Sequence, residues 1–158
     1  MTPPNLTETL AVLEAMPDFL ERAARDLGPA SVGVPGPGGS FSLLEQAWHL
    51  ADLEREGFGE RIDRLEREER PFLPDFDGDR IARERDYRSR RLDLGLAAFR
   101  AARARNLSRL RRLAGAAWDR GGMQEGVGDV TLADIPVRMA EHDASHRQEI
   151  MVLLERAR

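Results

Sequence analysis

Apolar residues recur at steps of three, four and seven along four long stretches of the chain. This spacing places them on one face of an α-helix, and none of the four stretches shows the alternation of a half-buried strand. Amphipathic helices of this length pack most simply as a bundle. The sequence therefore predicts an all-α four-helix bundle, with helices from about Asn5 to Leu27, from Ser42 to about Arg70, from the turn at 75–79 to about Ala114, and onward from Thr131 or Asp134.

Residues that start, bend or stop helices separate these stretches. Ser42 and Glu45 have the spacing of a capping box at the start of the second helix. Pro17 is expected to kink or restart the first helix, because proline has no N–H to donate. The segment at 75–79 lacks the spacing and the terminal glutamate of an EF-hand, so we interpret it as a turn with an aspartate N-cap rather than a calcium loop. The glycine-rich segment 121–129 is interpreted as a connection.

The composition excludes several kinds of chemistry. A length of 158 residues suits one domain, spanning 1–158, with a core of its own. Cysteine is absent, which excludes disulfides, zinc–thiolate sites and a cysteine nucleophile. All 24 basic residues are arginine, so Schiff-base and P-loop chemistry that requires lysine is excluded too.

Charge and hydropathy indicate where the protein works. No run of about 18 apolar residues occurs and the first residues do not resemble a signal peptide, so we expect a cytoplasmic protein with no membrane partner. Arginines gather between Arg83 and Arg112, although the net charge of the chain is −4. Such a run is more often a solvated helix face than a nucleic-acid patch, and no nucleic-acid partner is expected.

The chain has three histidines, and two of them lie four residues apart. His142 and His146 share the apolar stripe of the last helix with Met139 and Ile150. Side chains at this spacing lie one turn apart, about 5 to 6 Å between Cβ atoms, which suits two ligands of one divalent ion. Core histidines satisfied by hydrogen bonds produce the same pattern. From the spacing alone, both interpretations stay open.

Two further residues break the local pattern. His49 points away from the apolar stripe of the second helix, and in isolation it is interpreted as a surface or boundary residue. Arg103 lies within the apolar stripe of the third helix, which suits either a buried arginine paired with an acid or an anchor for an anionic substrate. Asp143 and Ser145 point away from the histidine face, so a Ser/His/Asp triad within the last helix is excluded.

An ordered set of short motifs resembles the DinB/YfiT-like superfamily of small metal-binding four-helix bundles. The resemblance covers nearly the whole chain. It is carried by Phe41-Ser42-x-x-Glu45, Trp48-His49-Leu50-Ala51-Asp52-x-Glu54, Pro74-Asp75-Phe76-Asp77-Gly78-Asp79, Phe99-x-x-x-Arg103, Trp118-x-Arg120-x-Gly122 and Ala140-Glu141-His142-Asp143-x-x-His146-x-x-x-Ile150.

The resemblance implies a divalent metal ion, zinc or nickel, held by His49, His142 and His146. Three imidazoles leave coordination positions open, as in catalytic rather than structural sites. The superfamily further implies a small-molecule substrate, a possible homodimer, and a metal-dependent transferase that uses a low-molecular-weight thiol as cosubstrate, or a related hydrolase. In that case Arg103 is the expected substrate or thiol anchor. The alternatives are a non-catalytic metal-binding stress-response or interaction protein and a purely structural bundle.

Residues near the expected ligands suggest how the site is supported. Metal-bound histidines usually donate their second N–H to a carboxylate or a carbonyl, and Glu45 and Asp52 lie within reach of His49 along its helix. Glu45 is equally expected to act in the capping box of this helix. Trp118, Arg120 and Met123 are expected either at the mouth of the site or as packing under a loop.

Overall fold

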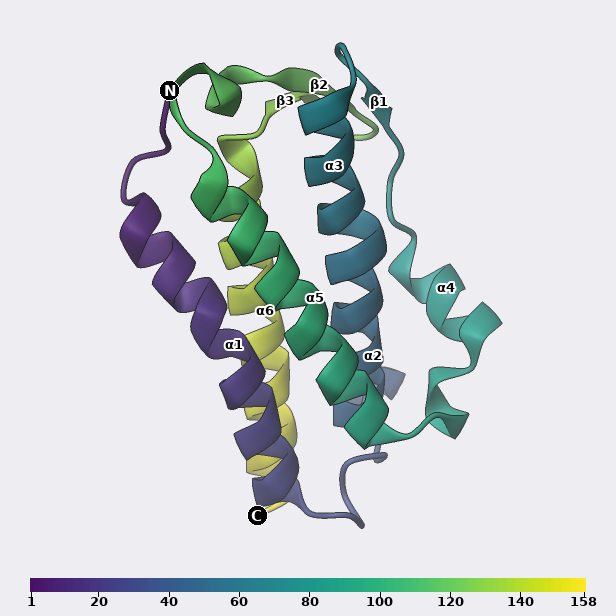
Figure 1. The fold of residues 1–158 in the computed structure, drawn as a ribbon. Coiled ribbons are helices and arrows are strands. Elements are labelled where there is room, and N and C mark those ends of the chain that lie inside the picture. Colours follow the sequence, from purple (N-terminus) through teal and green to yellow (C-terminus); the bar gives the residue numbers. More distant parts are fainter.

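The computed structural model describes residues 1–158 as a bundle of four helical rods (Figure 1). The rods are α1 (Leu6–Leu27), a composite second rod that begins with α2 (Leu43–Asp52), α5 (Leu92–Arg112) and α6 (Asp134–Arg156). α1 packs against α5 and α6, and α2 packs against the same two helices. The prediction of an all-α four-helix bundle is confirmed.

The rods do not alternate in direction. α1 and α6 both start at the end of the bundle where the N-terminus lies, whereas the second rod and α5 both run toward that end (Figure 1). A long crossover therefore joins the second rod to α5. None of the helices combines the length and the hydropathy needed to cross a bilayer.

The second rod contains a π-helical segment. α2 continues through η2 (Leu53–Gly59), where the backbone is π-helical, into α3 (Glu60–Arg67). The rod starts at the predicted capping box, in which the Ser42 side chain accepts from Glu45 N–H and the Glu45 carboxylate accepts from Ser42 N–H. A π-turn holds one more residue than an α-turn, so every side chain after it is rotated about the helix axis.

The expected third helix, from the 75–79 turn to about Ala114, is interrupted, and that part of the prediction is wrong. Asp86 adopts a left-handed conformation, with φ 48° and ψ 64°, which ends the first piece. Tyr87 then turns inward, and its hydroxyl donates to Asp52 at 2.5 Å. As predicted, an aspartate caps the start: Asp77 accepts from Arg80 N–H. The pieces are α4 (Gly78–Arg85), a 3₁₀ turn (Tyr87–Ser89) and α5.

Helix α1 continues without interruption through Pro17, so the helix does not restart there. Proline cannot donate to the carbonyl four residues earlier, which here belongs to Leu13. A guanidinium nitrogen of Arg103 donates to that carbonyl at 2.7 Å. A side chain from α5 therefore supplies the hydrogen bond that Pro17 omits.

A small sheet covers the end of the bundle where α3 and α5 finish and α6 begins (Figure 1). Its strand order is β1-β2-β3, with β1 parallel to β2 and β2 antiparallel to β3. The strands fall partly in the segment 121–129, which was predicted to be a connection without regular structure. Close approach requires glycine there, since a Cβ at Gly122 would lie 2.5 Å from the Pro71 carbonyl oxygen. The strands are β1 (Phe72–Leu73), β2 (Gly121–Gln124) and β3 (Gly128–Thr131).

The apolar core is divided into two clusters. One includes Leu13, Ile62 and Leu110 near the sheet, and the other includes Leu20, Phe99 and Ile150 toward the opposite end. Between them lie buried polar side chains from three of the rods, which we call the polar layer: Gln46, His49, Glu54, Arg103, Asn106, Asp143 and His146.

Candidate metal centre

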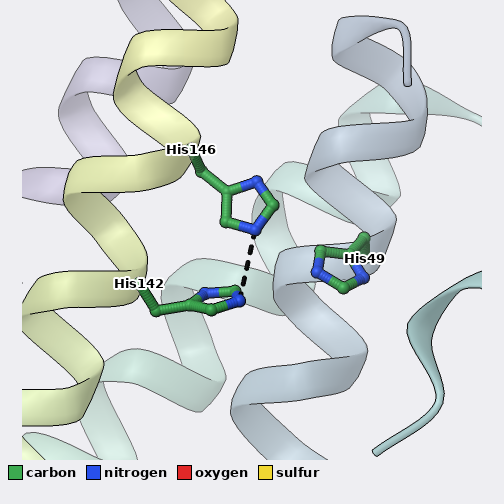
Figure 2. Close-up of side chains that lie close together, drawn as sticks. All are labelled: His49, His142 and His146. Carbon is green, nitrogen blue, oxygen red and sulfur yellow. Dashed lines mark hydrogen bonds between the residues drawn. The ribbon is translucent and has the colours of Figure 1, made fainter. Parts of the chain in front are cut away.

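The three histidines converge at the polar layer, to which His49 and His146 belong and which His142 borders (Figure 2). His49 projects from α2, while His142 and His146 project from successive turns of α6. One ring nitrogen of each lies within 4.8 Å of those of the other two, and the Nε2 atoms of His142 and His146 are 3.3 Å apart. Two nitrogens bound tetrahedrally to one zinc ion lie about 3.3 Å apart, given Zn–N bonds of 2.0 to 2.1 Å. The donor set therefore fits a divalent ion.

The surroundings keep the imidazoles neutral. Burial, together with the two neighbouring imidazoles, lowers the pKa of His49 to about 3. Burial and the nearby His142 lower the pKa of His146 to about 3, and burial lowers the pKa of His142. A neutral imidazole has a free lone pair, which is the form that binds a metal. At neutral pH all three rings are ready to act as ligands.

A side-chain relay orients His146. Its Nδ1 lies 2.5 Å from the Oε1 of Gln46, and the Nε2 of Gln46 donates to Glu149 at 2.5 Å. Because an amide oxygen only accepts, Nδ1 carries the proton and the lone pair of Nε2 faces His142. Gln46 was not predicted as a site residue, although it lies one turn before His49 on the same helix. That spacing is the signal that points to it.

The two carboxylates expected to support His49 are engaged elsewhere. Glu45 accepts from Ser42 N–H at 3.2 Å, and Asp52 accepts from the Tyr87 hydroxyl. The Nδ1 of His49 is buried and has no hydrogen-bond partner. Uncompensated burial of a polar nitrogen costs free energy. Hydrogen bonds within the core therefore do not account for the burial of His49, in contrast to one of the two interpretations left open by the sequence.

Close packing fixes the position of the His49 ring. The rings of Phe41 and Phe76 lie against it, with centroids 5.5 and 6.1 Å away. Gly78, at the start of α4, also borders the ring, and a Cβ there would lie 2.7 Å from Cε1 of His49. Glycine at position 78 therefore provides the space that the ring occupies.

Arg103 lies beside the histidines as part of a saturated ion-pair network. Its guanidinium is 2% exposed and donates to both oxygens of Glu54 at 3.0 and 2.9 Å and to both oxygens of Asp143 at 2.7 and 2.9 Å. The fifth N–H bonds the carbonyl of Leu13. No donor remains for a substrate, so the geometry matches a buried arginine paired with acids. Asp143 does point away from the histidine face, and Arg103 is its partner.

A pocket of about 420 Å³ opens beside His142, and we call it the His142 pocket. None of the residues expected at the mouth lines it. Trp118 is buried in the core, Arg120 donates to two carbonyls near the end of α3, and Met123 is exposed. The neighbouring strand residue Gln124 is the one that reaches the pocket. Its lining includes Phe58, Arg61, Phe76, Gln124, Arg138 and His142.

Comparison with protein families matches residues 12–150 to the DinB superfamily. The chain belongs to the DinB superfamily. The resemblance stated from the motifs is thereby confirmed. Comparison with curated proteins found no match.

Among solved structures, YfiT from Bacillus subtilis has a similar fold. It is described as a probable metal-dependent hydrolase with an unusual four-helix bundle topology. The two share 21% sequence identity at a TM-score of 0.88, over 99% of this chain and 89% of that one. Identity at this level establishes a common fold.

Proposed function

We propose that this DinB-superfamily chain is a divalent-metal-dependent enzyme acting on a small molecule, with His49, His142 and His146 as the ligands. The observation that carries the proposal is the convergence of three neutral imidazoles beside a pocket. Zinc and nickel both suit such a ligand set. A bound ion of this kind lowers the pKa of a coordinated water or thiol and polarises a carbonyl.

The chain's own residues have three roles in this proposal. The imidazoles hold the ion while leaving coordination positions for other ligands. Gln46 and Glu149 keep His146 in the tautomer whose Nε2 faces the centre. The rings of Phe41 and Phe76 lie against His49, and the ring of Phe58 lies against His142, so aromatic side chains border the centre.

The nucleophile is either water or a low-molecular-weight thiol. The description of YfiT as a probable metal-dependent hydrolase supports water. The absence of cysteine means that a thiol has to arrive as a cosubstrate, and the two arginines of the His142 pocket suit the carboxylates that such thiols carry. We therefore keep both variants of the proposal.

Metal content tests the proposal most directly. Protein purified without a polyhistidine tag or a nickel column is expected to hold about one divalent ion per chain, because three neutral imidazoles form one site. His146→Ala is expected to lose the ion, whereas Gln148→Ala, at an exposed position on the same helix, keeps it. Elemental analysis measures both. Metal-free wild-type protein with all three histidines intact would refute the proposal.

Turnover assays then distinguish the hydrolase from the thiol-dependent transferase. Bacillithiol, mycothiol and glutathione are each supplied with electrophilic substrates, and the same substrates are tested without a thiol. Turnover that needs a thiol identifies a transferase, and thiol-independent turnover identifies a hydrolase. Metal binding without any turnover indicates the non-catalytic alternative. Activity that survives His146→Ala rules out the metal mechanism.

A further inference from the structure

The His142 pocket contains a buried arginine that has no ion pair. The Arg61 side chain of α3 is 7% exposed, and no carboxylate lies within 4 Å of it. Its Nε is buried without a hydrogen-bond partner. The other deeply buried arginine, Arg103, contrasts with it, because two carboxylates and a carbonyl satisfy every N–H of that side chain.

No carboxylate in contact with Arg61 compensates its charge. Burial lowers the pKa of its guanidinium. The guanidinium carbon lies 5.6 Å from the Phe58 ring centroid, but a ring face accepts no directed hydrogen bond comparable to that of a carboxylate. Arg138 lines the same pocket without an ion pair, and the acids of the lining, Asp75 and Glu141, are exposed. The two arginines therefore lack ion-pair partners, and Asp75 offsets the lowering of the Arg61 pKa only in part.

A second unpartnered polar atom lies in the same pocket. Gln124, on β2, is 7% exposed, and its Oε1 is buried with no donor nearby. Buried polar atoms are almost always hydrogen-bonded, so an unsatisfied acceptor and an unsatisfied cationic donor in one pocket call for a common explanation. A ligand with an anionic group and an adjacent N–H or O–H satisfies both atoms.

The π-helical segment explains why Arg61 faces this pocket. In an uninterrupted α-helix, at about 100° per residue, Arg61 would lie about 120° around the axis from His49. One extra residue in the π-turn reduces this angle to about 20°. Phe58 bridges the two sites, because its ring also lies against His142, with centroids 6.0 Å apart. Arg61 thus shares the face of the metal centre.

We propose that Arg61 and Gln124 bind the carboxylate end of the substrate, and that the substrate carries an N–H or O–H next to that carboxylate. The Arg61 guanidinium donates to the carboxylate, and the Gln124 side-chain oxygen accepts from the neighbouring donor. This inference rests on the proposed function for its orientation, since His142 borders the pocket and the opposite end of the ligand reaches the metal centre. Arg61 is a binding residue that selects anionic substrates.

Calorimetric titration of the metal-loaded protein tests the inference with two matched probes. N-acetylglycine carries a carboxylate and an amide N–H, and N-acetylglycinamide is its neutral counterpart. The carboxylate is expected to bind more tightly. Arg61→Gln is expected to weaken its binding by about tenfold or more, because a charge-assisted hydrogen bond is lost, while binding of the neutral probe changes little. Gln124→Leu weakens binding of both probes. Arg105→Gln, an exposed arginine outside the pocket, is the matched control.

Thermal unfolding without a probe separates binding from a structural role. Removing an unpaired buried charge is expected to leave the melting temperature of Arg61→Met unchanged or higher. A clear fall in the melting temperature means that Arg61 supports the fold, and it overturns the inference. Equal affinity for the two probes, or carboxylate affinity unaffected by Arg61→Gln, also overturns it.

The same titration without the ion distinguishes this inference from the proposed function. Carboxylate binding that depends on Arg61 in protein that holds no metal supports the anion site even if the metal-dependent function fails. Binding that requires the ion but not Arg61 places the carboxylate on the metal and rejects the site. If the wild-type protein holds metal and turns over substrate, but Arg61→Gln binds the carboxylate as tightly as the wild type does, this inference is rejected and the proposed function stands.

Discussion

Single residues in the polar layer serve the fold and the candidate site in different ways. Arg103 joins Glu54 of η2 and Asp143 of α6 to the Leu13 carbonyl that Pro17 leaves free in α1. Four rods thus meet at one guanidinium. A saturated arginine of this kind stabilises the arrangement of the helices, whereas the unpaired Arg61 in the pocket is available to a ligand.

Arg103→Leu is therefore expected to lower the free energy of unfolding by about 3 to 5 kcal/mol, because two buried carboxylates lose their counterion. Urea denaturation measures the change. In the double variant Arg103→Leu/Pro17→Ala, part of the loss is expected to return, since the alanine introduced in place of proline has an N–H that can bond the Leu13 carbonyl. Unchanged stability combined with weaker binding of carboxylates would instead support Arg103 as the substrate anchor.

Gly78→Ala is expected to weaken metal binding without unfolding the protein. The added Cβ would lie 2.7 Å from Cε1 of His49, and the ring, as the end of a side chain, can move away from it. Its nitrogen then leaves the position shared with His142 and His146. Chelator competition is expected to show a loss of affinity of about tenfold or more, the size of effect seen when partners that position a metal ligand are removed.

Gly33→Ala is the matched control for this substitution, because a Cβ at position 33 has no neighbour within 4 Å. It is expected to bind metal like the wild type. The melting temperature of metal-free Gly78→Ala is expected to stay close to the wild-type value. Wild-type metal affinity in Gly78→Ala would mean that the His49 ring is not a ligand in its observed position.

The spacing of His142 and His146 on α6 indicated a candidate pair from the sequence, because a regular helix converts a step of four into one face. His49 became a candidate only through the family resemblance. Its helix buries nearly all of its faces, so an apolar stripe does not mark the direction of the site. Arg61 was not identified, because its direction depends on the π-turn that follows α2 and periodicity assumes none.

At the scale of elements, the π-helical segment determines which side chains share the candidate site. The carbonyl of Glu54 lies in this segment and accepts from the Asn106 side chain of α5 at 2.8 Å. A Cβ at Gly59 would lie 2.9 Å from the same carbonyl oxygen. The segment is therefore held in place by a hydrogen bond from a neighbouring helix and by a glycine.

Gly59→Ala is accordingly expected to lower the free energy of unfolding by about 1 to 3 kcal/mol, the usual cost of overpacking a well-packed interior. It is also expected to weaken carboxylate binding, because Arg61 follows the segment. Gly57→Ala is the comparison, since the Cβ there meets only the flexible Leu53 side chain at close range. Urea denaturation is the measurement. If the two substitutions lower the free energy of unfolding equally, close approach to the Glu54 carbonyl does not restrict the residue at position 59.

Long elements were predictable, and short ones were not. The four rods follow from apolar periodicity, and the capping box at Ser42 fixed the start of the second. The break at Asp86 was missed, because arginine-rich segments on both sides have helical composition and only the buried Tyr87 interrupts them. Strands of two to four residues are too short to display alternation, and the glycines in them resemble a loop.

At the scale of the whole molecule, the two apolar clusters hold the four rods on either side of the polar layer. Leucine and isoleucine at those positions would make a more uniform core. The polar layer instead introduces buried charges and imidazoles that must be paired, coordinated or left neutral. The layer thus couples folding of the whole bundle to the protonation of its histidines.

Metal-free protein is therefore expected to lose stability as the pH falls below about 6.5, the ordinary pKa of histidine. The folded state keeps His49 and His146 neutral down to about pH 3, whereas the unfolded chain takes up protons from about pH 6.5. The unfolded state then binds more protons, so acid favours it. Each such histidine makes the free energy of unfolding fall by at most about 1.4 kcal/mol for each unit decrease in pH.

Urea denaturation in the presence of a chelator, at a series of pH values from about 7.5 to 4.5, measures this effect across the range where histidine titrates in the unfolded chain. Carboxylates titrate in part of that range, so the reference is the variant His49→Gln/His142→Gln/His146→Gln. The free energy of unfolding of wild-type protein is expected to fall more steeply than that of the variant, and parallel curves would contradict the coupling. Zinc binds only the folded protein with neutral histidines, so added zinc is expected to remove the difference between the wild-type and variant curves. This holds above the pH at which protons displace the ion.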